Sequence, residues 1–233
     1  MEALSVNLAV TAAGVALVHV VAGPDHTVPF VMLARARGWS AAKTAFVTFV
    51  CGVGHVLSSL LLGVVGLALG AGIAHITALE EVRGSVAAWG LVAFGLAYAL
   101  WGIRWALVAK KQLALHEHNG HVHIHGGGLV PHRHGSDGES NVTFWTLFLI
   151  FAFGPCEPLI PLFMVPASRG RWDLALVTGG IFSAVTLATM VAAVLLLRAG
   201  VKLLPLAGLE RWSHALAGGV IAASGLAVIF LGL

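Results

Sequence analysis

Long apolar stretches alternate with short polar connections along this chain of 233 residues. Three of the stretches contain no Asp, Glu, Lys or Arg, and they lie at 44–79, 174–197 and 212–233. A helix rises about 1.5 Å per residue and the hydrocarbon core of a bilayer is about 30 Å thick, so about 20 apolar residues span it. The pattern therefore predicts helices that cross a membrane.

Six such spans are predicted, three in each half of the chain. They lie near 6–33, 45–71, 85–107, 143–165, 174–197 and 212–233. Tryptophans stand close to the ends of these spans, where amphipathic rings meet lipid headgroups, at positions 39, 105, 145, 172 and 212. We therefore expect an all-α integral membrane protein with six transmembrane helices.

The composition agrees with this fold class. Hydrophobic residues make up 58% of the chain and charged residues only 10%, whereas a soluble domain carries about 25% charged residues. The net charge of +3 comes from Lys and Arg in the connections, so it does not indicate binding to nucleic acid. The two cysteines, Cys51 and Cys156, are far apart and form neither a disulfide framework nor a CxxC motif.

The basic residues predict how the helices are oriented. Ten fall in connections on one side of the membrane, namely Arg35, Arg37, Lys43, Arg104, Lys110, Lys111, Arg133, Arg198, Lys202 and Arg211. Three fall on the other side: Arg83, Arg169 and Arg171. Because cytoplasmic loops carry the excess of Lys and Arg, we expect both termini outside and the long middle loop in the cytoplasm of a cell-membrane protein.

The two halves resemble each other. Residues 23–26 (Gly-Pro-Asp-His) match residues 154–157 (Gly-Pro-Cys-Glu) at an offset of 131, and Gly95 and Gly102 match Gly225 and Gly232 at an offset of 130. With three spans per half, the second copy enters the membrane from the opposite side. The prediction is two inverted repeats, 1–108 and 143–233, joined by a loop at 109–142. A duplicated channel or electron carrier would show the same pattern.

Prolines interrupt the first and fourth predicted spans, at 24, 29, 155, 158 and 161. A proline inside a helix lacks its N–H and displaces the carbonyl four residues earlier, so Pro24 frees that of Val20 and Pro155 frees that of Phe151. Irregular backbone inside a membrane is tolerated only where protein or water satisfies it. Single kinks are often purely structural, but two at matching places predict a binding site between the repeats.

Ionisable groups within the spans gather at these breaks. They are His19, Asp25, His26 and His55 in the first half and Cys156 and Glu157 in the second. A charge near the bilayer centre costs at least a few kcal/mol, so these groups need partners. Imidazole and carboxylate together suit borderline divalent metals, whereas calcium and magnesium favour oxygen ligands alone. A proton relay through Asp25 and His26, and a purely structural role for His55, are the alternatives.

The predicted cytoplasmic loop is rich in histidine. Seven of the twelve histidines lie there, at His116, His118, His121, His123, His125, His132 and His134. Repeated HxH spacing among glycines predicts a flexible chelating tract that captures, buffers or senses metal. A pH-responsive or merely solvated linker is the alternative.

The motifs resemble a known family. His19 ahead of Gly23-Pro24-Asp25-His26, the segment Gly54-His55-Val56-Leu57-Ser58, a histidine-rich middle loop and six spans are similar to NicO-type nickel/cobalt transporters and the related urease accessory membrane proteins. The resemblance implies that His19, Asp25, His26 and His55 select the metal. Five residues separate His19 from the Asp-His pair, whereas the family's nickel/cobalt permeases have four.

These observations predict a secondary transporter of divalent transition-metal ions, with Ni²⁺ or Co²⁺ as cargo and Zn²⁺ compatible with the same ligands. A second hypothesis is a membrane accessory or sensor protein that delivers nickel to an enzyme such as urease. A membrane thiol electron carrier is a third, although it needs a cysteine in each half and Asp25 holds the matching position. We expect no enzymatic activity and no resident cofactor; the expected partners are the metal ion, the lipid bilayer and a cytoplasmic metallochaperone.

Overall fold

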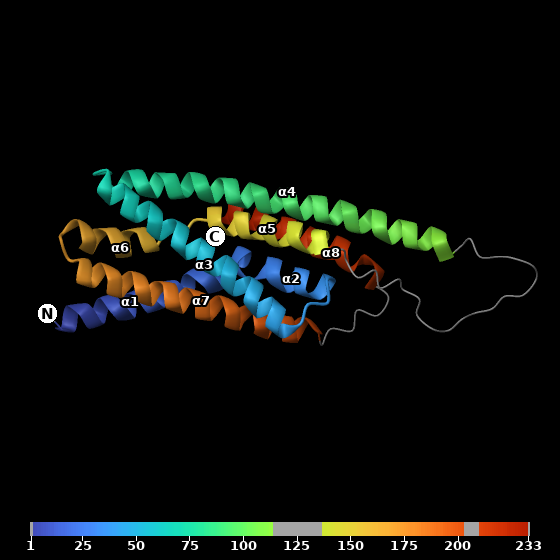
Figure 1. Cartoon of the computed structure of the whole chain (residues 1–233), viewed down its shortest axis with the longest axis horizontal. Helices are drawn as coiled ribbons and strands as arrows, with labels where there is room; N and C mark the ends of the chain where they lie inside the picture. The colour runs from blue at the N-terminus through green and yellow to red at the C-terminus, as the bar shows by residue number, and fades with distance from the viewer. Residues whose placement is uncertain (1, 114–136, 203–209, 233) are drawn as a thin grey trace, which may run out of the picture.

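The computed structural model describes residues 2–113, 137–202 and 210–232, and every secondary-structure element in these ranges is a helix. The elements are α1 (Glu2–Ala22), η1 (Pro24–His26), α2 (Val28–Ala36), α3 (Ala41–Ala68), α4 (Ile73–Leu113), α5 (Asp137–Phe153), α6 (Leu159–Ser168), α7 (Trp172–Lys202), η2 (Glu210–Trp212) and α8 (Ser213–Leu231). The helices pack lengthwise into an elongated bundle (Figure 1). The seven loop histidines lie outside the described residues.

Several of these helices are long and apolar enough to cross a membrane. Four meet that description alone, in α3, α4, α7 and the η2–α8 segment, and the pair formed by α1 and η1–α2 makes a fifth if it counts as one bent span. The fourth predicted span is divided between two shorter apolar helices, α5 and α6. The chain thus has the architecture of a multi-pass membrane protein.

Both predicted helix breaks are present. The axis bends by 81° between α1 and the η1–α2 segment, around Gly23 and Pro24. The second break occupies residues 154–158 between α5 and α6. Each break contains a proline directly after a glycine, and neither proline has an N–H with which to continue the ladder of its helix.

Helix α4 begins twelve residues earlier than the predicted span at 85–107. The prediction that Arg83 lies in a connection was therefore wrong. Glu80 and Arg83 are three residues apart on one face of α4 and form an ion pair there, so each compensates the charge of the other inside the bundle. The stretch without charged residues ends at position 79, whereas helix α4 continues through Glu80 and Arg83.

Helices α4 and α8 make the most intimate packing in the bundle. A Cβ atom at Gly95 of α4 would overlap the backbone of Ala222 and Gly218 on α8, and one at Gly225 of α8 would lie 2.9 Å from the carbonyl oxygen of Ala88. Glycine at these positions lets the two backbones touch, as is common where membrane helices cross. The predicted repeat glycines are thus contact points between the two halves.

Candidate metal centre

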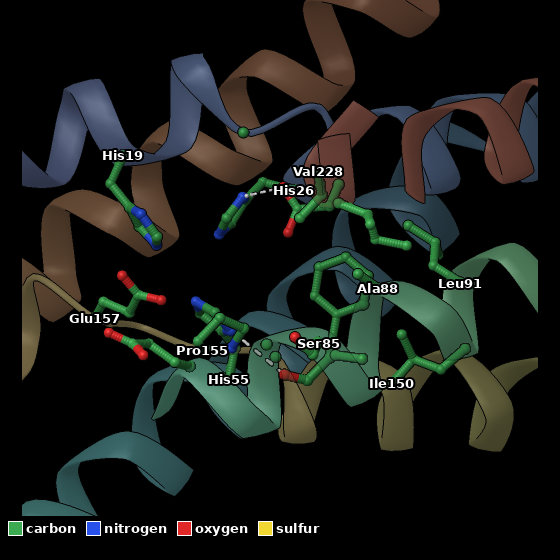
Figure 2. A pocket seen from close by; sticks show the side chains of 18 of the residues that line it. His19, His26, His55, Ser85, Ala88, Leu91, Ile150, Pro155, Glu157 and Val228 are labelled. Atoms are coloured by element: carbon green, nitrogen blue, oxygen red, sulfur yellow. Dashed lines mark hydrogen bonds and ion pairs between the residues drawn. The ribbon is translucent and has the colours of Figure 1, made fainter. Parts of the chain in front are cut away.

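Three histidines meet at the first helix break. His19 comes from the last turn of α1, His26 from η1 and His55 from the middle of α3. Each offers one ring nitrogen such that these atoms all lie within 4.8 Å of one another. The ring centroids of His19 and His26 are 4.5 Å apart, and those of His26 and His55 are 5.1 Å apart. Figure 2 shows the three rings facing the same space.

The imidazole of His26 is oriented by the preceding residue. Its Nδ1 lies 2.9 Å from Oδ1 of Asp25, while its Nε2 is buried and has no hydrogen-bond partner among the described residues. A carboxylate that holds one ring nitrogen fixes the ring and leaves the other nitrogen for a metal. Asp25 therefore lies where it can support a ligand.

His55 is oriented by the second helix break. Its Nδ1 donates a hydrogen bond to the carbonyl oxygen of Phe151 at 3.3 Å, and its Nε2 is buried without a partner in the described part of the chain. A carbonyl only accepts hydrogen bonds, so Nε2 keeps its lone pair. Pro155 was predicted to free this carbonyl because it has no N–H to donate to it. Gly154 N–H also donates to it, at 3.0 Å.

The two second-half candidates lie beside this cluster rather than within it. Cys156 is fully buried, with its Sγ 3.7 Å from Nε2 of His19, but among the described residues the group of mutually close ligand atoms comprises the three histidines alone. Glu157 is exposed and lines the cavity next to them. The other cysteine, Cys51, is buried in the apolar core, as expected for a packed residue.

A cavity of about 440 Å³ adjoins the histidines. Its walls come from both breaks and from α3, α4, α5 and α8. Carboxylates line one part, with Glu81 on α4 and Glu157 in the second break, whereas Leu91, Ile150 and Val228 line another (Figure 2). The histidine cluster therefore borders a chamber that is large enough for a hydrated ion and carries negative charge on part of its wall.

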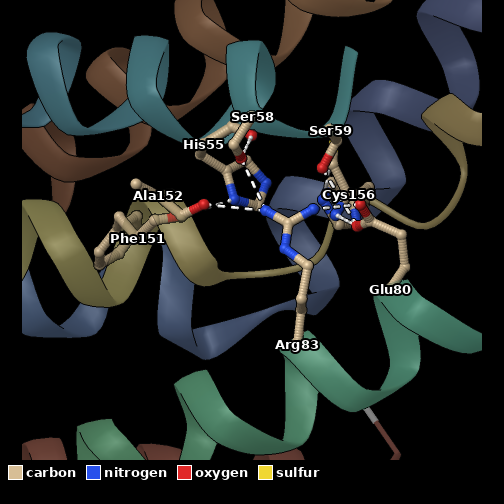
Figure 3. A network of polar contacts seen from close by, with 9 residues as sticks. His55, Ser58, Ser59, Glu80, Arg83, Phe151, Ala152 and Cys156 are labelled. Carbon is tan, nitrogen blue, oxygen red and sulfur yellow. Dashed lines mark hydrogen bonds and ion pairs between the residues drawn. The ribbon is translucent and has the colours of Figure 1, made fainter. Parts of the chain in front are cut away.

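A buried polar network supports the second break (Figure 3). The carboxylate of Glu80, fully buried, accepts hydrogen bonds from the N–H of Cys156 at 2.9 Å and from the hydroxyl of Ser59 at 3.1 Å, and it pairs with Arg83. Arg83 also donates to the carbonyl of Ala152 at 2.9 Å.

The sequence reasoning missed both members of this ion pair because they stood at the end of an apolar stretch and were assigned to a connection. Their i,i+3 spacing was the available signal, since residues three apart share a helix face and opposite charges there can pair.

The donor set defines the chemistry. Three neutral imidazoles leave coordination positions free for water or a further ligand, and imidazole suits Ni, Co, Zn and Cu better than Mg or Ca. Because a metal needs unprotonated nitrogen, two buried and unpartnered Nε2 atoms pointing into one space are an arrangement suited to a cation. The site is thus a candidate centre for a borderline transition metal inside an apolar bundle.

No protein-family model matches this chain, and comparison with curated proteins and with solved structures likewise gives no match. The fold and the site define the class, a multi-pass helical membrane protein with a histidine cluster at a helix break. The resemblance to NicO-type transporters stays a prediction.

Proposed function

We propose that this protein is a secondary transporter of divalent transition-metal ions, with Ni²⁺ or Co²⁺ as cargo. One observation carries the proposal: three histidines from three separate helical elements bring their ligand nitrogens within 4.8 Å at the break of a membrane helix, beside a cavity. Transporters place substrate sites at discontinuous helices near the middle of the membrane. Imidazole ligands would replace part of the water shell of the ion and lower the cost of removing it from water.

The directions of the helices support two inverted repeats of three spans. In Figure 1, α1 and α2 run from left to right and α5 and α6 from right to left. Helix α1 packs against α7 of the other half, and in the same way α5 packs against α3.

The contacts between α4 and α8 are likewise preserved when the two halves are exchanged. The contact of Gly95 with Ala222 becomes that of Gly225 with Val92 when 130 is added to the first number and subtracted from the second. Such reciprocal contacts are what a pseudo-twofold axis produces.

The packing around the cluster supports alternating access. Phe30, just after the first break, and Phe151, just before the second, are both buried with ring centroids 4.6 Å apart. Both lie on the α2 and α5 side of the breaks, toward the end of the bundle where the histidine loop is connected. A chamber with carboxylates on one side of the cluster and packed aromatic rings on the other side is the arrangement expected of a transporter open in one direction.

The charge asymmetry supports the proposed topology. Arg35, Lys43 and Arg198 stand at the ends of helices on the loop side of the bundle, so the positive-inside rule puts that side in the cytoplasm. The histidine loop would then exchange metal with a cytoplasmic metallochaperone. Its repeated HxH pairs suit buffering, and selection is proposed for the three buried histidines.

Flux measurements test the proposal. Purified protein in liposomes that contain a metal-sensitive dye should show uptake of Ni²⁺ or Co²⁺, and His26→Ala should abolish it. His75→Ala is the matched control because His75 is an exposed imidazole on α4 outside the cluster. Absence of Ni²⁺ and Co²⁺ flux in both gradient directions would refute the transporter. Tight metal binding without flux would favour the accessory or sensor protein.

A thiol electron carrier receives no support from the geometry. The chain has two cysteines, and Cys51 and Cys156 belong to different clusters of the apolar core. A thiol relay requires the two sulfur atoms to approach each other and a redox partner. Full flux in a Cys51→Ser variant would separate metal transport from thiol chemistry.

A further inference from the structure

Three carboxylates line the cavity; Asp25 holds His26, and the other two lie apart from the histidine cluster. Glu81 is on the first part of α4 and Glu157 is in the second helix break. Both side chains are exposed, and both line the cavity. Neighbouring Glu80 is already engaged by Arg83, Ser59 and the backbone of Cys156, so it is not available to a mobile ion.

The inner wall of the cavity carries two buried imidazole nitrogens without hydrogen-bond partners in the described chain. His26 and His55 are 3% and 2% exposed, and the Nε2 atom of each is buried and without a hydrogen-bond partner in the described chain. Both residues line the same cavity as the two glutamates. In Figure 2, the carboxylate of Glu157 points toward the space between the rings of His19 and His55. Oxygen ligands and nitrogen ligands thus face one chamber.

We propose that Glu81 and Glu157 form an entry site that captures the hydrated divalent cation and delivers it to the three histidines. The inference rests on the proposed transport function and adds an initial binding site to the path of the ion. Exposed carboxylates bind a cation that keeps most of its water, whereas the buried imidazoles require that water to be shed. Two negative charges in a cleft with apolar walls also raise the local concentration of cations and the rate of their arrival.

The position of this site gives the entry a direction. Glu81 lies eight residues after the start of α4, and Leu91, which lines the same cavity, lies ten residues deeper along that helix. Ten residues correspond to about 15 Å of helix. The carboxylates are therefore nearest the α3–α4 turn, at the end of the bundle opposite the connections to the histidine loop. In this conformation the ion enters from that end.

The kinetic test uses the double variant Glu81→Gln, Glu157→Gln in Co²⁺ flux into liposomes. The Michaelis constant should rise about tenfold while the maximal rate changes by less than about twofold, because capture is lost and the histidines are intact. The wild-type Michaelis constant should also rise with ionic strength, and that of the double variant should not. Asp173→Asn is the control, since Asp173 is an exposed carboxylate paired with Arg171 and does not line the cavity.

An unchanged Michaelis constant in the double variant, with wild-type flux present, would overturn the entry site and leave the transporter intact. Both glutamates are exposed, so the variant should elute as the wild type does in gel filtration. If its elution shifts, the single Glu81→Gln and Glu157→Gln variants decide the matter, each with a smaller rise in the Michaelis constant expected.

A binding test separates failure of the entry site from failure of transport. Mn²⁺ prefers oxygen ligands and reports its binding by electron paramagnetic resonance. The His26→Ala, His55→Ala variant should still bind Mn²⁺, and adding the two Gln substitutions should remove that binding. Mn²⁺ that remains bound after the carboxylates are removed would refute the entry site, whether or not the wild type transports metal.

Discussion

The break after α1 and the break after α5 occupy matching places in the two halves, yet their polar groups are used differently. At the first break the side chains act: His26 joins the cluster and Asp25 orients it at 2.9 Å. At the second break the backbone acts: the carbonyl of Phe151 orients His55, and the N–H of Cys156 is bound by Glu80.

Under the proposed repeat and the proposed metal site, this difference divides the requirements of the site between the two halves. In that proposal the first half supplies the ligands that bind and release the ion, and the second half supplies a fixed frame that orients His55. Ligand orientation by outer groups accounts for much of the affinity of a metal site. Both halves can therefore contribute to the proposed site, although the three clustered histidines all come from the first half.

Removing the frame at the second break should have the largest effect. Glu80→Ala leaves Arg83 without its carboxylate and the N–H of Cys156 without its acceptor, and we expect a loss of about 3 kcal/mol in stability, the low end for breaking a buried pair because Arg83 is partly exposed. The melting temperature in detergent should fall clearly. Co²⁺ should also bind more weakly, because the carbonyl of Phe151 that orients His55 is no longer held in place.

Glu81→Gln is the matched control for that substitution, since the neighbouring carboxylate is exposed and holds no part of the break. Its melting temperature should equal that of the wild type. Equal melting temperatures for Glu80→Ala and the wild type would show that the second break needs no frame.

Removing the orienting charge at the first break should have the next largest effect. Asp25→Asn keeps a hydrogen-bond acceptor beside His26 but loses the negative charge, and the affinity for Ni²⁺ should drop about tenfold to hundredfold. Titration calorimetry measures this loss, and the melting temperature should change little. Affinity within experimental error of the wild type, as expected for Asp173→Asn, would place Asp25 outside the site.

A smaller effect is expected from the thiol at the second break. Sγ of Cys156 lies near His19 but outside the group of mutually close nitrogens, so Cys156→Ser should change Co²⁺ affinity by less than about threefold. The absorption spectrum of the Co²⁺ complex should contain no thiolate charge-transfer band. Such a band in the wild type, lost in Cys156→Ser, would make the second break a source of ligands and remove the contrast with the first.

The smallest effect is expected from the loop. Deletion of residues 116–134 should leave Ni²⁺ flux at saturating metal within about twofold of the wild type, because we expect the histidine-rich tract to buffer metal rather than select it. Flux of the deletion variant is measured in the same liposomes beside His26→Ala. If the deletion abolished flux and His26→Ala did not, the transported ion would be bound in the loop and not at the breaks.

Sequence periodicity was sufficient for the helical class and for both breaks, because proline acts locally. The convergence of His19, His26 and His55 was also predictable, since few polar residues were available to share the cost of burial. Glu80 and Arg83 were not recovered: charged residues at the end of an apolar stretch resemble a connection unless their i,i+3 pairing within one helix is recognised. Glu157 was predicted as a metal ligand, but its position beside the three histidines rather than among them depends on the path of the second break.

The glycine contacts between α4 and α8 constrain how the molecule moves. Two helices whose backbones touch at Gly95 and Gly225 cannot slide past each other without collision, so they turn together. Helix α4 carries Glu81 and Leu91, and α8 carries Val228, all of which line the chamber. If access changes as proposed, we expect this wall to move as one body and α1, α2 and α7 to rotate against it.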